Sequence, residues 1–375
     1  MDRSDWWRAS ACALSLFFAS ISAAGLARAD DLEKAIAAVK SASDEDLRKE
    51  IDRRLQKKKN AAKPGAAVSR GLTPGGGSGL SSLGDGQLLA AAHVTSRSIY
   101  GADDRKDWYQ LSPGSGLEPL ARASVALFDA AKLDAPSDGT VRIKAKSFQE
   151  TRHLCPTPKP KFAEQPSGAF CSGTLVRPDL VLTAGHCVRE ISHNEALPPD
   201  VTGVRFVFGY AMRGPDADAA QVPDTNVFAG KAVVGGEKPD AKNADRHDWA
   251  LVRLDRPVPS SVAEPVTNWE AAPVAKGARV FVIGFPAGLP LKYAAGATVR
   301  DASNENWFVA NLDTFGGNSG SGVYDQASKK LVGVLIEGEV DYKPDTAKGC
   351  YLINLCPDNG CSGETVGRLS QVRMP

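Results

Sequence analysis

Three short segments of the chain contain the residue types that nucleophilic catalysis requires. They are residues 182–187 (LTAGHC), 248–251 (DWAL) and 316–322 (GGNSGSG). A serine hydroxyl is a poor nucleophile at its own pKa and needs an adjacent base, and histidine is the side chain that titrates near neutrality. A carboxylate that accepts the second ring N–H fixes the tautomer of that histidine. The segments therefore supply a candidate base, acid and nucleophile, in the order His, Asp, Ser.

These motifs resemble those of the chymotrypsin-like (trypsin-fold) serine peptidases, over roughly residues 95–345. The likeness is nearest to the bacterial glutamyl-endopeptidase-like branch, whose nucleophile motif also reads G-N-S-G-S where trypsin has G-D-S-G-G. Each motif alone is moderate evidence. All three in the family's order, with Cys171 and Cys187 around the first, form a specific pattern.

The resemblance implies a role for each residue of the site. His186 would take the proton of Ser319 and return it to the leaving amine, while Asp248 would orient the imidazole. The backbone N–H groups of Gly317 and Ser319 would form the oxyanion hole, worth about 2.7–4 kcal/mol per donor. A side chain at position 317 would crowd the required turn.

Rival residues lack this context. Ser321 is a possible nucleophile two residues on, and Asp245 is a possible acid, but in the family pattern Ser319 and Asp248 hold the roles. The glycine-rich run opens no helix and precedes no Lys-Ser/Thr, which argues against phosphate binding. We interpret the remaining histidines as surface residues: His93, His153, His193 and His247.

The primary substrate pocket of this fold is walled by residues just before the nucleophile and by a later strand. Asp313 lies six residues before Ser319, where trypsin has the acid that binds Arg or Lys, and Thr314 follows as in glutamyl endopeptidases. The later strand contains Glu337 but lacks the histidine with which those enzymes hold glutamate. We therefore expect a basic side chain before the cut bond. The alternative is that Asp313 pairs internally and the pocket is unselective.

The N-terminal segment indicates export, and the number of cysteines indicates disulfides. Residues 9–26 carry no charge, follow Arg3 and Arg8, and precede an A-x-A site at 27–29, which is typical of a secretory signal peptide. A membrane anchor is the alternative for this stretch. Six cysteines remain after its removal, an even number that suggests disulfides in a secreted or periplasmic protein.

The resemblance pairs Cys171 with Cys187. The other four cysteines, Cys155, Cys350, Cys356 and Cys361, allow three pairings. We expect the last three to attach a C-terminal tail to the second barrel. A zinc site there is the alternative, although no C-x-x-C pair occurs.

Composition limits the function classes further. The 375 residues are 42% hydrophobic and 24% charged, with a net charge of +1. Such a chain can bury a large core, and its overall charge gives no support for binding nucleic acid. No later stretch is long and apolar enough to span a bilayer.

The chain divides into four segments: a signal peptide (1–29), a helical arm or propeptide (30–60), a Gly/Pro/Ser-rich linker (61–88) and a peptidase domain (90–375). Asn318 replaces the aspartate with which trypsin-like enzymes sense a new N-terminus. If residues 30 to about 97 are a propeptide, activation must work differently, and Arg97-Ser98 is a plausible processing point.

Short runs of β-branched and aromatic residues separated by turn residues predict an all-β fold. The runs are 169–176, 180–183, 204–208, 250–254, 279–283, 307–312 and 331–336. The resemblance implies two six-stranded antiparallel barrels, with His186 and Asp248 on the first and Ser319 on the second. It also implies a monomeric serine endopeptidase, made as a zymogen, that acts on polypeptides without a cofactor. A catalytically silent homologue that binds proteins and an esterase are the alternatives.

Overall fold

The computed structural model describes residues 99–188, 200–237, 247–338, 340–345 and 347–373. The expected signal peptide, helical arm and linker lie outside the described residues, as do His93, His193 and Asp245.

Six antiparallel strands close into a first barrel in the order β11-β12-β8-β7-β3-β9. Five of these strands are buried over most of their residues; all but the last residue of β7 are buried, for example. Strand β11 is the exception, because most of its residues are half-buried or exposed. The strands are β3 (Ser124–Asp129), β7 (Cys171–Arg177), β8 (Leu180–Thr183), β9 (Val204–Phe208), β11 (Val227–Glu237) and β12 (Trp249–Leu254).

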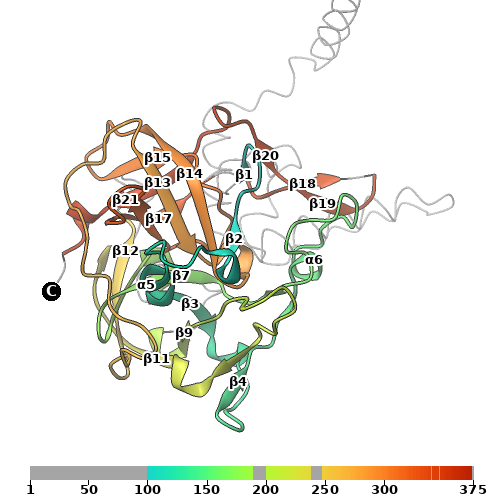
Figure 1. Cartoon of the computed structure of the whole chain (residues 1–375), viewed down its shortest axis with the longest axis vertical. Coiled ribbons are helices and arrows are strands. Elements are labelled where there is room, and N and C mark those ends of the chain that lie inside the picture. Colours follow the sequence, from blue (N-terminus) through green and yellow to red (C-terminus); the bar gives the residue numbers. More distant parts are fainter. Residues whose placement is uncertain (1–98, 189–199, 238–246, 339, 346, 374–375) are drawn as a thin grey trace, which may run out of the picture.

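A second barrel forms from the C-terminal half of the chain and packs against the first (Figure 1). Its order is β13-β16-β17-β21-β15-β14, and the β13–β14 pairing closes the ring. The strands are β13 (Arg279–Gly284), β14 (Lys292–Asp301), β15 (Trp307–Ala310), β16 (Gly322–Asp325), β17 (Leu331–Glu337) and β21 (Glu364–Arg368). The predicted fold of two six-stranded antiparallel barrels is confirmed.

Shorter elements surround the barrels. Strand β2 (Lys106–Asp107) extends the second sheet beside β14, and β1 (Ile99–Tyr100) runs parallel to β20 (Leu355–Cys356). Short antiparallel pairs join β18 (Tyr342–Asp345) to β19 (Cys350–Ile353), β4 (Thr140–Arg142) to β10 (Gln221–Pro223), and β5 (Lys146–Ser147) to β6 (Pro166–Ser167).

Helices are few and short in the described part of the chain. The α-helices are α5 (Glu118–Ala123) and α6 (Phe148–Thr151). The 3₁₀ turns are Trp108–Gln110, Ala130–Lys132, Gly185–Cys187, Val201–Gly203, Asp224–Asn226, Pro286–Gly288 and Leu369–Gln371. Among the described residues, none of these helices has the length and apolar character needed to cross a membrane.

Three apolar clusters hold the structure together. The largest fills the first barrel and continues across the barrel interface through Phe281, Phe285 and Tyr324. A second fills the second barrel around Phe308 and Leu335. The third joins strand β1 to the segment before Ser319: it contains Ile99, Phe148, Leu154, Ala287, Leu289 and Phe315.

Three disulfides cross-link the described chain: Cys171–Cys187, Cys155–Cys350 and Cys356–Cys361. The last three cysteines do not attach a tail to the second barrel as expected. Cys356–Cys361 closes a local loop, and Cys350, at the start of β19, reaches Cys155 in the segment between first-barrel strands β3 and β7. Cys350, Cys356 and Cys361 are all disulfide-bonded, so none of them offers a thiolate to the zinc site considered as the alternative.

Candidate active site

His186 and Asp248 meet at the edge of the first barrel, where β8 ends and β12 begins. Both carboxylate oxygens of Asp248 are engaged by one residue. Oδ2 lies 2.6 Å from His186 Nδ1, and Oδ1 accepts a hydrogen bond from the His186 backbone N–H at 2.8 Å. The carboxylate is buried, whereas the imidazole is 33% exposed. Because an ionised carboxylate only accepts, the pair assigns the ring proton to Nδ1 and leaves Nε2 as an acceptor.

Gly185 makes this approach possible. A Cβ at this position would lie 2.2 Å from the Glu237 carbonyl oxygen and 2.9 Å from Asp248 Oδ1. Any side chain here would push the histidine turn away from the carboxylate. The lack of space for a side chain therefore explains why the A-G-H-C motif has glycine at position 185.

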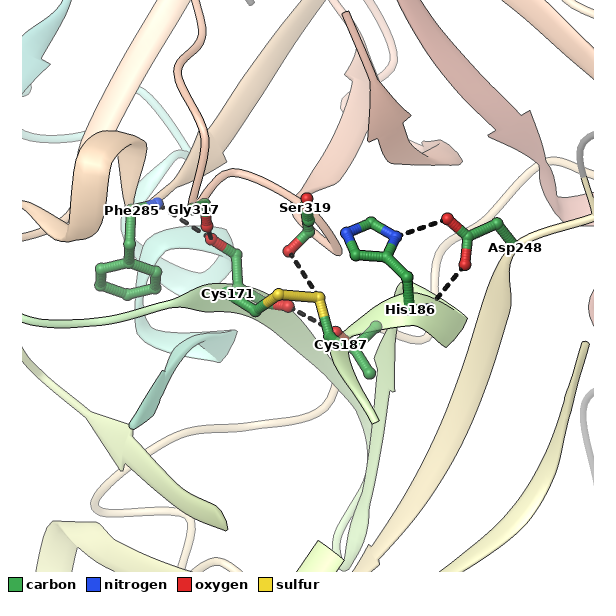
Figure 2. The surroundings of a disulfide bond; sticks show 9 residues. Cys171, His186, Cys187, Asp248, Phe285, Gly317 and Ser319 are labelled. Carbon is green, nitrogen blue, oxygen red and sulfur yellow. Dashed lines mark hydrogen bonds and ion pairs between the residues drawn. A yellow bond between two sulfur atoms is a disulfide. The ribbon is translucent and has the colours of Figure 1, made fainter. Parts of the chain in front are cut away.

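Ser319 approaches the same imidazole from the second barrel. Figure 2 shows the His186 ring between the Asp248 carboxylate and Ser319. The serine lies in the turn between β15 and β16, and its carbonyl oxygen accepts a hydrogen bond from the Ser172 backbone N–H of β7 at 2.8 Å. Gly320, with φ +85°, would place a Cβ 2.1 Å from the Ser172 carbonyl oxygen. The Ser319 turn of one barrel is thus fixed against a strand of the other.

Gly317 has a backbone conformation that glycine alone adopts readily. Its φ is +98°, and a Cβ would lie 2.9 Å from both the Gly288 nitrogen and the Phe285 carbonyl oxygen. Its own carbonyl oxygen accepts a hydrogen bond from Ser172 Oγ at 2.7 Å, and that hydroxyl accepts one from the Phe285 N–H at 3.1 Å. These bonds fix the peptide between Gly317 and Asn318.

The Cys171–Cys187 disulfide lies beneath this turn (Figure 2) and joins the start of β7 to the histidine turn. The Cys187 sulfur is 3.7 Å from the Ser319 carbonyl oxygen. Cys171, His186 and Cys187 place their sulfur and nitrogen atoms within 4.8 Å of one another. Both sulfurs are bonded to each other, so this trio offers no thiolate to a metal.

The rival residues that the structure describes are engaged elsewhere. Ser321 is fully buried and donates to Asn318 Oδ1 at 3.0 Å. His247 pairs with Glu237, with 2.6 Å between Nδ1 and Oε2, and His153 is exposed with φ +49°.

The expected pocket residues divide into two groups. Asp313 and Thr314 are buried before the Ser319 turn, whereas Glu337 is half-buried at the end of β17. Asp313 Oδ1 accepts a hydrogen bond from the Tyr100 backbone N–H at 2.7 Å. Burial raises the pKa of Asp313 to about 7, against the lowering effect of that bond and of Arg105. The Thr314 hydroxyl donates to Glu364.

Sequence reasoning missed a charged cluster that supports this region. Arg105 is fully buried, contacts Asp103 through two nitrogens at 2.9 and 2.6 Å, and stacks 4.3 Å over the Phe315 ring. Lys292 is also buried and lies 2.7 Å from Asp107 Oδ1; burial lowers the pKa of Lys292 to about 8. The only sequence signals were the charges of residues 103–107 and a lysine within an apolar run.

Comparisons with known proteins gave one matching family model and one solved structure that we report here. Residues 171–334, which include His186, Asp248 and Ser319, match the family model described as "Trypsin-like peptidase domain". One similar solved structure is entitled "Structure of Glu endopeptidase in complex with MPD"; it is 17% identical, with a TM-score of 0.41 over 72% of this chain and 93% of that chain. A search of curated proteins found no match.

Proposed function

Since residues 171–334 form a trypsin-like peptidase domain, we propose that the chain is an exported serine endopeptidase in which His186, Asp248 and Ser319 cleave peptide bonds through an acyl-enzyme. The observation that carries the proposal is the double engagement of Asp248 by His186, on the far side of the ring from Ser319. A silent homologue that only binds proteins has no need of this arrangement.

The proposed reaction follows from the tautomer of His186, in which Nδ1 carries the proton and Nε2 can accept one. His186 Nε2 takes the hydroxyl proton as Ser319 Oγ attacks the carbonyl carbon of the substrate. The Asp248 carboxylate stabilises the imidazolium that results. When the tetrahedral intermediate collapses, the C–N bond breaks and Nε2 gives the proton to the leaving amine. A water molecule, deprotonated by His186 Nε2, then attacks the acyl-enzyme. The acid product is released, and Nε2 returns the proton to Ser319.

The negative charge of the tetrahedral intermediate needs fixed donors. We assign this role to the backbone N–H groups of Gly317 and Ser319, which flank a peptide fixed by Ser172 and Phe285. Removal of one such donor costs about 2.7–4 kcal/mol in other enzymes. The positive φ of Gly317 supports this assignment, because a residue with a side chain would alter the turn.

The proposed substrate is a polypeptide with a basic side chain before the cut bond, and Asp313, Thr314 and Glu337 remain the proposed pocket residues. Three disulfides support secretion or a periplasmic location, because oxidising compartments retain such bonds. Processing near Arg97–Ser98 is part of the proposal, since Ile99 and Tyr100 are buried directly after that point. Asn318 is engaged by Ser321, which supports an activation route different from that of trypsin.

The test compares wild-type protein with Ser319→Ala on a quenched peptide library and on a small ester. Hydrolysis of peptides that requires Ser319 is the expected result. Ester turnover without peptide turnover would favour the esterase alternative. A folded wild-type protein without either activity, before and after trimming near Arg97, would favour the protein-binding homologue.

A further inference from the structure

Asp341 is a buried acid directly before β18, and it accepts a hydrogen bond from the segment that leads to Ser319. The Gly316 backbone N–H donates to Asp341 Oδ2 at 2.8 Å, across 25 positions of sequence. The next peptide along the chain carries the Gly317 N–H, one of the two donors assigned above to the oxyanion hole. A carboxylate from outside the motifs is thus bonded one peptide away from a proposed catalytic donor.

The backbone around Asp341 is anchored by Asn354, a buried residue between β19 and β20. The Asn354 backbone N–H donates to the Asp341 carbonyl oxygen at 2.8 Å, and Asn354 Nδ2 donates to the Val340 carbonyl oxygen at 2.8 Å. The acid is therefore held from its own side of the contact and can act as a fixed acceptor.

An aromatic contact runs beside the hydrogen bond. The Tyr342 ring, next to Asp341, lies 5.4 Å from the Phe315 ring, next to Gly316, measured between centroids. Two consecutive residues of one segment thus contact two consecutive residues of the other. This double contact fixes how the two segments lie relative to each other.

The peptide between Gly316 and Gly317 determines where the proposed donor points. Its carbonyl oxygen, on Gly316, accepts a hydrogen bond from the Ala287 backbone N–H at 2.6 Å. The N–H and C=O of a planar trans peptide point in opposite directions, so this bond turns the Gly317 N–H away from Ala287. The following peptide is bonded at the Gly317 carbonyl oxygen by Ser172 Oγ at 2.7 Å.

Two glycines in succession give this turn little intrinsic restriction on its backbone angles. We propose that Asp341 supplies that restriction, as a positioning residue that acts through Gly316 to direct the Gly317 N–H at the substrate oxygen. The inference rests on the proposed peptidase function and adds a residue to that same site. Loss of the carboxylate releases the Gly316 N–H, and the Gly316 carbonyl can then rotate away from Ala287.

The experiment measures kcat and KM on the fluorogenic peptide amide that wild type cleaves fastest. Four proteins are compared: wild type, Asp341→Ala, Asp341→Asn and, as a matched control, Asp345→Ala. The Asp345 carboxylate also accepts backbone N–H bonds, from Ala347 at 3.2 Å and Lys348 at 3.1 Å, but these bonds lie in the turn between β18 and β19. Each protein is also titrated with a trifluoromethyl ketone of the same peptide, whose adduct with Ser319 carries an oxyanion.

Removal of a whole oxyanion-hole donor lowers kcat by about 10²–10³-fold, so a donor that is present but poorly directed should cost less. We expect Asp341→Ala to lower kcat by about 10- to 100-fold and to change KM by less than about 3-fold. Its affinity for the trifluoromethyl ketone should fall by the same factor as kcat/KM. Asp341→Asn keeps an oxygen acceptor and should stay within about 3-fold of wild type, as should Asp345→Ala.

The proposal is overturned if folded Asp341→Ala keeps the kcat of wild type, if its loss lies entirely in KM, or if Asp345→Ala loses as much. Equal affinity of wild type and Asp341→Ala for the trifluoromethyl ketone would also overturn it. These outcomes leave the peptidase function intact. Failure of the function is a different result: a folded wild type that neither cleaves any peptide nor reacts with a fluorophosphonate probe.

A second measurement needs no variant and therefore does not depend on the folding of Asp341→Ala. Amide hydrogen exchange of the wild type, followed by NMR with ¹⁵N-labelled glycine, reports on the Gly316 N–H directly. A bonded amide exchanges only when its bond opens, so Gly316 should exchange at least about 10-fold more slowly than an unstructured glycine. Faster exchange than this would contradict the proposal.

Discussion

The backbone N–H of Tyr100 donates a hydrogen bond to the Asp313 carboxylate at 2.7 Å, across 213 positions of sequence. Strand β1 is thereby attached to the run that leads to Ser319. The attachment is apolar as well as polar, because Ile99 and Phe315 belong to the same buried cluster. Strand β1 and the segment before the Ser319 turn therefore pack as one unit.

The raised pKa of Asp313 predicts a specific dependence of stability on pH. A folded-state pKa near 7, against an ordinary value near 3.8, means that the folded protein binds more protons than the unfolded chain between about pH 4 and 7. Wild type should therefore lose stability from this group as the pH rises through that window. Asp313→Asn keeps an oxygen acceptor for Tyr100 but does not ionise.

The free energy of unfolding of Asp313→Asn, relative to wild type, should thus increase from pH 4 to pH 7 by up to about 4 kcal/mol and stay level above it. Urea denaturation at pH 4 and pH 8 measures this change. A difference between the two proteins that is the same at both pH values would contradict the assignment.

The buried Lys292–Asp107 pair predicts that loss of the lysine destabilises the fold, and that a second substitution at Asp107 recovers part of this loss. Lys292→Met removes the cation 2.7 Å from Asp107 Oδ1 and leaves a buried carboxylate unpaired, which should destabilise the fold by about 3–5 kcal/mol. Adding Asp107→Asn should recover part of that loss, because the unpaired charge is then removed. A double variant no more stable than Lys292→Met would contradict this expectation.

The disulfides should differ in their contribution to stability according to loop length. Cys155–Cys350 joins residues 195 apart, and Cys356–Cys361 joins residues 5 apart. On the chain-entropy argument, loss of the first bond costs about 5 kcal/mol and loss of the second about 2 kcal/mol. Thermal unfolding of the two double-serine variants should therefore show the larger decrease for Cys155→Ser/Cys350→Ser. The reverse order would contradict this argument.

Asp248→Asn tests the tautomer argument at the proposed site. An asparagine can present its NH₂ group to Nδ1, which places the ring proton on Nε2, where the base must accept. We expect kcat to fall by about 10⁴-fold with the fold intact. Asp216→Asn, at an exposed acid of the first barrel, is the matched control. A loss below 10-fold in Asp248→Asn would exclude the proposed role of the carboxylate.

The barrel strands could be predicted from sequence where the local pattern is strong. Leu180–Thr183 and Val204–Phe208 have the predicted bounds, because β-branched and aromatic residues end at turn residues. Strand β14 was not among the predicted runs. Its Ala-Ala-Gly-Ala sequence has low β-propensity, and its pairing with β13 and β15 supplies the stabilisation that the local sequence lacks.

The same distinction applies to the site. His186, Asp248 and Ser319 lie in local motifs that can be read directly. Asp341 lies in no motif, and its hydrogen bond to Gly316 forms only when the segment after β17 packs against the run before Ser319. Likewise, four cysteines allow three pairings, and only the folded chain shows that Cys155 lies next to Cys350.

The central claim is that His186, Asp248 and Ser319 form an assembled catalytic site, and reaction with a fluorophosphonate probe tests it most directly. The probe is applied to the purified wild-type protein and to Ser319→Ala, each before and after trimming near Arg97. The account predicts labelling of the trimmed wild type and none of Ser319→Ala in either form. A folded, trimmed wild type that the probe does not label would contradict the account.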